Sequence, residues 1–258
     1  MITYKSTHHT DRKIVIKLGG STLDGLNEQF YKKIKVLQEE GFQIVITHGG
    51  GPAINRALDK MGIASKNIDG LRVTTDDMIG IVQKTLIGEV NPYVVAQLNT
   101  ANILAIGLNG FDSGLLKGHY LNKDVYGHVG EVTEVNVKVV EQLLKLNIVP
   151  VIACVGVTEQ FEPLNINGDT VACQVAKAIH AESLLLVTDV AGIRINDEYQ
   201  TNVTEEEIDQ WIAEGDIYGG MIPKVKGALQ CLHAGVPSVQ IVNESLSGTI
   251  ITQKELVK

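Results

Sequence analysis

The sequence predicts an α/β protein whose three layers, helix, sheet and helix, are built around a mainly parallel, open sheet. Short apolar runs rich in Val, Ile and Leu alternate with longer runs of helical periodicity along most of the chain. Nearly continuous apolar runs are typical of strands that are buried on both faces of a parallel sheet. Regular strand-to-helix alternation gives such a sheet right-handed crossovers. A chain of 258 residues, 44% of them hydrophobic, can fill one large domain or two lobes.

In chain order, strands are expected where apolar and β-branched residues form short runs, and helices where apolar residues recur at helical spacing. The expected strands are 13–17, 43–47, 103–107, 148–153, 184–188 and 238–242. The expected helices are 25–40, 53–61, 75–87, 92–100, 136–146, 169–181, 204–214 and 223–234. The helix at 204–214 opens with Thr204 and Glu207, which have the spacing of a capping box.

The segment 115–135 interrupts this alternation. Apolar and polar residues alternate there around glycines and the turn-forming residues 122–124, a pattern typical of antiparallel hairpins. We expect a boundary between two lobes near Ala181, ahead of the strand at 184–188. Residues 1–181 then form an N-terminal lobe and residues 182–258 a C-terminal lobe.

Composition argues against several classes of protein. The formal net charge of −8 leaves no basic surplus for neutralising phosphates, so general nucleic-acid binding is not expected. No apolar run approaches the roughly 20 residues that span a bilayer, and the polar segment 1–12 lacks the apolar core of a signal peptide. Three scattered cysteines without a CxxC pair indicate buried, reduced thiols: Cys154, Cys173 and Cys231. We therefore expect a cytoplasmic protein with no membrane partner.

Two glycine turns follow expected strands, and both are suited to binding an anion. One is His48-Gly49-Gly50-Gly51-Pro52, and the other is Lys17-Leu18-Gly19-Gly20-Ser21. Glycine lets the backbone approach a ligand closely, and the unpaired N–H groups of a following helix attract negative charge. Lys17 adds positive charge, although a lysine at a strand end can also extend to solvent. Neither turn has the spacing of a Walker P-loop or a Rossmann fingerprint, so phosphate binding needs a different turn geometry.

Charged residues beside other turns are further candidates. Arg72 follows a glycine turn and can bind a carboxylate through its guanidinium group, although it can also be an ordinary surface arginine. Asp169 opens an expected helix, where it caps the helix, holds lysines in place, or does both. Lys224 lies in the first turn of a helix, where the dipole disfavours a cation, which suggests a nearby anion; Lys226 is the competing choice.

The strand at 184–188 ends next to Asp189 and a glycine turn. Ligands of open parallel sheets bind at the carboxyl ends of strands, so this position suits a nucleotide. The histidines show neither the spacing of metal ligands nor that of a catalytic triad. They are His8, His9, His48, His119, His128, His180 and His233. We expect neither a structural metal ion nor a nucleophile activated by histidine.

The order of these motifs between residues 17 and 225 resembles that of the amino acid kinase family. The motifs are KLGG at 17–20, HGGGP at 48–52, DGLRVT at 69–74, NINGD at 165–169 and GMIPKV at 220–225. HGGGP together with DGLRVT favours the branch whose phosphoryl acceptor is N-acetyl-L-glutamate. The resemblance implies transfer of the γ-phosphoryl group of ATP, carried with Mg²⁺, to the acceptor's side-chain carboxylate. That reaction is the second step of arginine biosynthesis.

Matching motif positions also implies a role for each site residue. Lys17 and Lys224 would stabilise the transferring phosphoryl group, and Asp169 would orient both lysines. The residues implied to hold the acceptor are Gly50, Gly51, Arg72 and Asn165. The residues implied to contact the nucleotide are Gly19, Gly20, Asp189, Val190, Ala191, Gly192, Ile193, Ile217, Tyr218 and Met221. The N-terminal lobe would bind the acceptor and form a dimer, the C-terminal lobe would bind ATP, and no protein-held metal ion is implied.

Gly168 departs from the family pattern, because alanine is usual at that position, and the segments 108–112 and 153–156 differ as well. The region before the first strand is about a dozen residues long, shorter than the N-terminal helix of arginine-inhibited hexameric members, so we expect an arginine-insensitive homodimer. A kinase for an aminoadipate-type acyl-amino acid and a non-catalytic regulatory protein are the alternatives. A PII-type regulator is a further partner that the resemblance allows.

Overall fold

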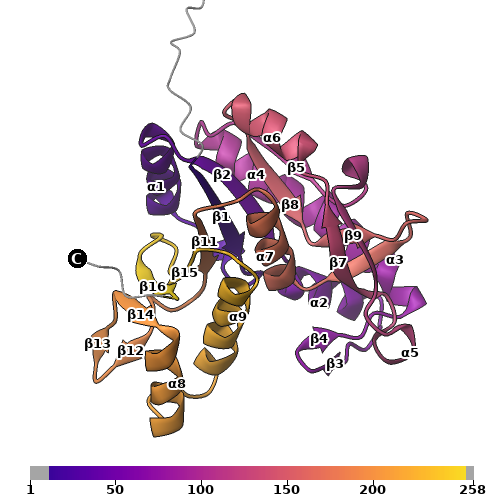
Figure 1. Ribbon diagram of the computed structural model, residues 1–258. Coiled ribbons are helices and arrows are strands. Elements are labelled where there is room, and N and C mark those ends of the chain that lie inside the picture. Colours follow the sequence, from indigo (N-terminus) through magenta and orange to yellow (C-terminus); the bar gives the residue numbers. More distant parts are fainter. Residues whose placement is uncertain (1–11, 254–258) are drawn as a thin grey trace, which may run out of the picture.

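The computed structural model describes residues 12–253, and within this range eight strands form one central sheet (Figure 1). The strand order is β14-β16-β15-β11-β1-β2-β8-β5. Neighbours run parallel except β15 and β16, which pair antiparallel, so the expected mainly parallel sheet is confirmed. The bounds are β1 Lys13–Leu18, β2 Gln43–His48, β5 Ala105–Leu108, β8 Val149–Ala153, β11 Ser183–Val187, β14 Asn202–Thr204, β15 Ser238–Val242 and β16 Gly248–Thr252. The polar segment 1–11, with His8 and His9, lies outside the described residues.

Helices lie on both sides of this sheet (Figure 1). Their bounds are α1 Glu28–Glu39, α2 Gly51–Lys60, α3 Asp76–Thr85, α4 Asn91–Thr100, α5 Lys123–Tyr126, α6 Lys138–Lys145, α7 Gly168–Ala178, α8 Glu205–Glu214 and α9 Met221–His233. A π-helical turn at Leu86–Val90 joins α3 to α4. Short 3₁₀ turns lie at Leu23–Gly25 and Asp112–Gly114.

The start of α1 differs from expectation because of local capping, whereas the cap of α8 is the expected one. The helix expected at 25–40 begins only at Glu28, since the Asn27 side chain accepts hydrogen bonds from the backbone N–H groups of Gln29 and Phe30. The capping box of α8 is confirmed: the Thr204 side chain accepts from the Glu207 backbone N–H, and the Glu207 carboxylate accepts from the Thr204 backbone N–H.

A small four-stranded barrel within the described chain contains the hairpin expected at 115–135. Its strands are β6 Leu116–Tyr120, β7 Val129–Val135, β9 Val155–Val157 and β10 Pro163–Ile166. The antiparallel pairing of β6 with β7 is confirmed, whereas β9 and β10 were not expected. Two short hairpins are also new: β3 Asn67–Ile68 with β4 Leu71–Arg72, and β12 Arg194–Ile195 with β13 Glu198–Tyr199.

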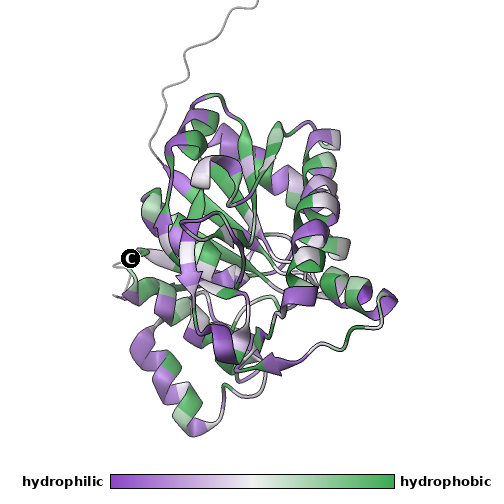
Figure 2. Ribbon diagram, turned by 90° about the vertical axis from the view of Figure 1, so that its right-hand side faces the viewer, coloured by the Kyte–Doolittle hydropathy of each residue, from purple (hydrophilic) through white to green (hydrophobic). Residues whose placement is uncertain are grey.

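The hydrophobic core lies on both faces of the central sheet. Along β1, Val15 belongs to one buried cluster, whereas Ile14 and Ile16 belong to another. This alternation is what a strand covered on both faces requires. Figure 2 shows hydrophobic residues gathered along the central strands and polar residues on the outlying helices. No helix among residues 12–253 is both long and apolar enough to cross a membrane.

Candidate active site

Two glycine turns lie side by side at the carboxyl edge of the sheet. Strands β1 and β2 are parallel neighbours, with Leu18 opposite His48, so the turns that follow them meet. A Cβ atom at Gly20 would lie 2.8 Å from the backbone nitrogen of Gly51 and 2.8 Å from Pro52 Cδ. Only glycine therefore fits at position 20 without displacing the neighbouring turn.

The triple-glycine turn leads directly into α2. Gly50 is the N-cap residue, and no side chain caps the first backbone N–H groups. A Cβ atom at Gly50 would lie 2.6 Å from Leu86 Cδ2 and 3.1 Å from Val90 Cγ2, so the turn is pressed against the π-helical turn. The uncapped N–H groups and the positive end of the helix dipole make this turn suited to an anionic ligand.

Lys17 and Asp169 form an ion pair between the first strand and the start of α7. Lys17 Nζ lies 2.9 Å from Asp169 Oδ1, and the two side chains are 17% and 49% exposed. The N-cap of α7 is Asn167, whose side chain accepts from the backbone N–H groups of Asp169 and Thr170. The capping interpretation of Asp169 is therefore wrong, and its carboxylate is free to hold Lys17.

Lys224 has a different partner. Its Nζ lies 2.7 Å from Oδ1 of Asp189, which is two residues beyond the end of β11. The hydrogen bond and the charge of Lys224 lower the pKa of the Asp189 carboxyl group below its usual range. The implied arrangement in which Asp169 orients both lysines differs from this structure, where the ion pair of Asp169 is with Lys17. Lys226 is exposed on the outer side of α9.

Both ion pairs line a cavity of about 180 Å³. Gly19 from the first glycine turn also borders it, as do three polar residues to which the sequence analysis gave no role of their own: Ser21, Thr22 and Thr188. Ser21 and Thr22 directly follow two glycines, and that proximity was the signal that could have identified them. We call this space the lysine cavity. Two ammonium groups and several backbone and hydroxyl donors make it suited to a polyphosphate.

A second cavity, of about 260 Å³, lies on the other side of the α7 N-terminus. We call it the arginine cavity, because Arg72 lines it together with Asn165, Asn67 and the three glycines of the turn. Gly168 borders the arginine cavity and Asp169 borders the lysine cavity, so adjacent residues of α7 separate the two. A ligand in each cavity would meet close to the Lys17–Asp169 pair.

Arg72 and Asn165 are held in place by neighbours. Arg72 Nη2 lies 2.6 Å from Asn55 Oδ1 and 3.4 Å from the Gly51 carbonyl oxygen, and Nη1 donates to the Ser65 hydroxyl. Burial lowers the pKa of the Arg72 guanidinium group from its ordinary value, and the group keeps its charge at neutral pH. Asn165 Nδ2 lies 2.9 Å from the Thr74 hydroxyl oxygen. The arginine cavity therefore offers a fixed cation and a fixed amide to a small acid.

The residues implied to contact the nucleotide lie in different environments: at the lysine cavity, in the core or on the surface. Asp189 and Gly19 border the lysine cavity. The side chains of Ile193 and Ile217 are buried in the core, which leaves only their backbone for a ligand. Gly192 has φ +135° and faces Thr249, so glycine is needed there for packing. Tyr218 is 76% exposed. The other four positions, Gly20, Val190, Ala191 and Met221, lie outside the residues that line the lysine cavity.

The three cysteines are free and buried, as expected. Cys154 borders the arginine cavity, a position that the sequence analysis did not recognise. Burial raises the pKa of its thiol to about 12, and such a thiol is not a nucleophile at neutral pH. Cys154 therefore contributes packing beside the arginine cavity and takes no part in the chemistry.

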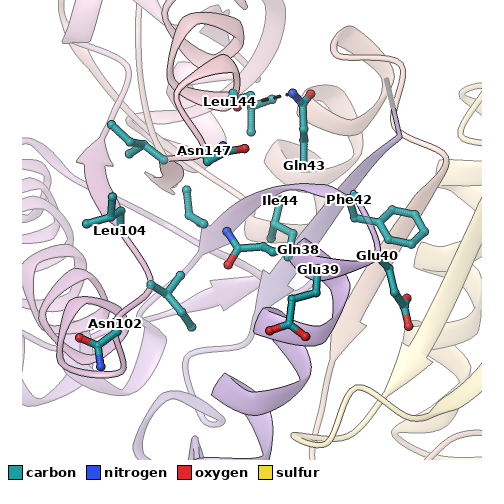
Figure 3. Close-up of a pocket in the computed structure, with 14 residues that line it drawn as sticks. Gln38, Glu39, Glu40, Phe42, Gln43, Ile44, Asn102, Leu104, Leu144 and Asn147 are labelled. Atoms are coloured by element: carbon teal, nitrogen blue, oxygen red, sulfur yellow. Dashed lines mark hydrogen bonds between the residues drawn. The ribbon is translucent and has the colours of Figure 1, made fainter. Parts of the chain in front are cut away.

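A cavity of about 550 Å³, larger than these two, lies at the opposite edge of the sheet (Figure 3). It is lined by the starts of β2 and β8 and by the residues before β5, including Gln43, Asn102 and Leu104. Its walls carry no cluster of cations, and the amino ends of parallel strands are not where ligands of such sheets bind. We therefore assign the ligand-binding role to the two smaller cavities at the carboxyl edge.

A mainly parallel sheet whose carboxyl edge holds glycine turns and two lysines around a cavity suited to phosphate is the arrangement expected of a small-molecule kinase. The chain belongs to the amino acid kinase family, whose family model matches residues 12–243. It is 44% identical over 230 residues to the acetylglutamate kinase of Halalkalibacterium halodurans, covering 89% of this chain and 88% of that one. It is 41% identical over 256 residues to the acetylglutamate kinase of Bacillus pumilus, covering 96% and 99%.

Solved structures agree with this assignment. The crystal structure of smu.665 from Streptococcus mutans superposes with a TM-score of 0.85 at 36% identity, over 95% of this chain and 100% of that chain. N-acetylglutamate synthase from Neisseria gonorrhoeae, solved with coenzyme A and N-acetyl-glutamate, has a TM-score of 0.79 at 21% identity, over 97% of this chain and 61% of that one. At that identity the second likeness concerns the fold alone.

Proposed function

We propose that this chain transfers the γ-phosphoryl group of ATP to the side-chain carboxylate of N-acetyl-L-glutamate, giving N-acetyl-L-glutamyl 5-phosphate in the second step of arginine biosynthesis. The observation that carries the proposal is that adjacent residues of α7, Gly168 and Asp169, line the arginine cavity and the lysine cavity beside the Lys17–Asp169 pair. One cavity suits a polyphosphate and the other suits a small acid with an amide. The similarity to proteins named acetylglutamate kinase supports the choice of acceptor.

The residues present match the demands of this reaction. A carboxylate acceptor with a pKa near ~4 is ionised at neutral pH, so no general base is needed. An acceptor oxygen forms a bond to the γ-phosphorus as the bond from that phosphorus to the oxygen bridging to ADP breaks. The difficulty is to bring an anion up to a polyanion, so positioning and positive charge dominate. Lys17, Lys224 and the N–H groups of the triple-glycine turn supply both.

Magnesium fits this site as an ion that arrives on the nucleotide. The carboxylates of the lysine cavity, Asp169 and Asp189, are each paired with a lysine. A nucleotide-bound Mg²⁺ would supply further positive charge to the phosphoryl oxygens. Asp169 then orients Lys17, while Lys224 exchanges its carboxylate partner for the phosphoryl group.

The two-lobe division is part of the proposal. Arg72 and Asn165 precede the boundary at Ala181, and Asp189 and Lys224 follow it. An acceptor lobe at 1–181 and a nucleotide lobe at 182–258 are consistent with that distribution. A cytoplasmic location is proposed as well, in keeping with buried cysteines that form no disulfide.

A homodimer is proposed through the free side of β5. This strand ends the central sheet, and apolar side chains on and beside it are exposed: Leu104 is 63% exposed, Ile106 41% and Tyr93 of α4 43%. An apolar sheet edge of this kind is usually covered by another chain. Light scattering coupled to size-exclusion chromatography should give the mass of a dimer, and the mass of a hexamer would overturn this part of the proposal.

The test of function is hydroxylamine trapping of the acyl phosphate. The protein is incubated with MgATP and either N-acetyl-L-glutamate, free glutamate or N-acetyl-aminoadipate. Hydroxamate formed chiefly with N-acetyl-L-glutamate is the expected result. A preference for N-acetyl-aminoadipate would show that this compound is the acceptor. If folded protein that binds ATP gave no product with any of the three compounds, a regulatory role would be favoured.

A further inference from the structure

A buried polar network lies directly beneath the triple-glycine turn. His48 has no exposed surface and Asn91 is 6% exposed. Asn91 Nδ2 lies 2.9 Å from His48 Nε2 and 2.9 Å from the Val151 carbonyl oxygen. His48 Nδ1 lies 2.9 Å from the Gly49 carbonyl oxygen. Because unpaired buried polar groups are costly, a network of this kind has a defined set of donors and acceptors.

The Val151 carbonyl oxygen sets the direction of each hydrogen bond. A carbonyl oxygen only accepts, so the amide nitrogen of Asn91 faces it. The Asn91 amide oxygen lies instead over Gly107, where any side chain would collide with it. The second N–H of Asn91 then points at His48 Nε2, which must accept. The ring proton is left on Nδ1, which donates to Gly49. Burial lowers the pKa of His48 to about 4, so the ring stays neutral at physiological pH.

Fixing the Gly49 carbonyl also fixes the N–H of Gly50. The two groups belong to one planar, trans peptide unit, in which C=O and N–H point in opposite directions. With the carbonyl held toward the buried imidazole, the Gly50 N–H points to the opposite side, and Gly50 itself lines the arginine cavity. A turn of three glycines has little intrinsic preference for that orientation, because glycine tolerates most backbone conformations.

The π-helical turn positions the Asn91 side chain to reach His48. The backbone N–H of Asn91 donates to the Leu86 carbonyl oxygen, five residues earlier, which is the hydrogen bond of a π-turn. Leu86 and Val90 contact Gly50 while Asn91 reaches His48. One turn of helix therefore supports both the backbone of Gly50 and the imidazole that orients the preceding peptide. π-Turns of this kind are often found at functional sites.

We propose that His48 and Asn91 are positioning residues that hold the Gly49–Gly50 peptide with its N–H turned toward the part of the arginine cavity where the acceptor meets the transferring phosphoryl group. The inference rests on the proposed function and extends it to two residues that contact no substrate. Removing a preorganised N–H donor from such a site lowers kcat about 100- to 1000-fold. Disorienting the donor should have a smaller effect of the same kind.

The first experiment compares four variants in the hydroxamate assay. Asn Nδ2 occupies the position of histidine Nδ1, whereas Gln Nε2 occupies that of Nε2. H48Q and N91L should therefore lower kcat about 30- to 100-fold with KM values changed less than threefold. H48N, which keeps a donor for Gly49, should recover at least tenfold over H48Q. The matched control is N99L, since Asn99 lies on the same helix and binds the carbonyl oxygens of Val95 and Ala105. N99L should lower the melting temperature while kcat stays within twofold.

The second experiment does not depend on activity or on the folding of any variant. Long-range ¹H–¹⁵N spectra of the wild-type protein report which imidazole nitrogen of His48 carries the proton. The expected result is a neutral ring protonated at Nδ1 from about pH 5.5 to 8.5. A ring protonated at Nε2 would overturn the inference, as would H48N no more active than H48Q. If wild type gives no hydroxamate, the proposed function fails, and the spectrum still decides the hydrogen-bond pattern.

Discussion

Lys17 and Asp169 are 152 positions apart in the chain, yet Nζ and Oδ1 lie 2.9 Å apart at the border between two ligand cavities. Lys17 is the penultimate residue of β1 and Asp169 lies in the first turn of α7. Asn167 caps that helix, which leaves the Asp169 carboxylate free for the lysine. The ammonium group is therefore held by an element that both cavities share.

Asp169→Asn should lower kcat with little effect on stability. A carboxylate that is about half exposed contributes at most ~1 kcal/mol to folding through its ion pair. Loss of orientation at Lys17 should reduce turnover by up to the 100- to 1000-fold typical of losing one electrostatic contact. The hydroxamate assay and urea unfolding measure the two quantities. Glu182→Gln, which breaks the similarly exposed pair with Arg12, is the control. Equal kcat losses in the two variants would refute a specific role for Asp169.

Asp189→Asn should strengthen ATP binding. The Asp189 carboxylate neutralises Lys224 before the nucleotide arrives, so its removal raises the positive charge of the lysine cavity. We expect an affinity gain of roughly fivefold, about 1 kcal/mol, at low salt, and a smaller gain at high salt. Calorimetry with MgATP measures the affinity. Weaker binding by the Asp189 variant would show that this carboxylate itself contacts the nucleotide or its magnesium.

Lys224→Ala should still bind nucleotide while losing most turnover.

Arg72→Lys should raise the KM for the acceptor and leave the KM for ATP unchanged. The guanidinium group is held by Asn55, Ser65 and Gly51, and a lysine cannot reproduce this planar arrangement. Loss of one charge-assisted hydrogen bond, worth about 1.5–3 kcal/mol, corresponds to a KM increase of roughly 10- to 100-fold. Steady-state kinetics with each substrate varied provide the measurement. Arg194→Lys, at the exposed β12–β13 hairpin, should leave both constants unchanged.

Gly168→Ala should stabilise the protein without reducing turnover. A methyl group there would lie 3.4 Å from Lys17 Cε and 3.5 Å from Cys154 Sγ, which is ordinary contact, and position 168 does not have positive φ. Replacing glycine by alanine in a compatible conformation adds about 0.4–1 kcal/mol. Urea unfolding should show a gain similar to that of Gly80→Ala in α3, where nothing obstructs a methyl group. A kcat loss above threefold would mean that the added methyl group displaces Lys17.

Acidification should destabilise the fold through His48. Its pKa is about 4 in the folded protein and near 6.5 in the unfolded chain, so the unfolded chain binds more protons between these values. The free energy of unfolding therefore falls as pH drops from about 6.5 to 4, by up to ~3 kcal/mol. Chemical denaturation across this range should show the loss in wild type and a reduced loss in His48→Asn. His119→Asn, at an exposed histidine, should retain the wild-type slope.

The sequence was informative about the strands whose neighbours cover both faces. β1, β2, β8, β11 and β15 were predicted within a residue of their ends, because an apolar run that is too short for a helix is best satisfied as a buried strand. Strand β14 has three residues and β16 follows β15 by a tight antiparallel turn, so neither has a periodicity long enough to detect. The barrel strands β9 and β10 depend on pairing with β6 and β7, and no local pattern encodes that contact.

Residues of the candidate site could be selected from the sequence, but their contacts could not. Glycine turns and charged residues at strand ends placed Lys17 and Arg72 among the candidates, and the structure places them in the linings of the two cavities. Whether Asp169 or Asp189 pairs with Lys224 depends on distances between a strand end and two helices, which the sequence does not contain. The same holds for His48 and Asn91, which are 43 residues apart and meet only because a π-turn rotates Asn91 toward β2.

Because Gly20 lies against the turn at Gly51, we expect the proposed nucleotide and acceptor to bind in a coupled manner. The two glycine turns pack against each other. A ligand that orders one turn therefore also reduces the conformational freedom of the other turn before the second ligand binds. The second ligand then loses less entropy on binding. Thermodynamic reciprocity requires that each substrate raise the affinity of the other by the same factor. If the proposed substrates bind here, contact between two residues without side chains is expected to make them heterotropic effectors of one another.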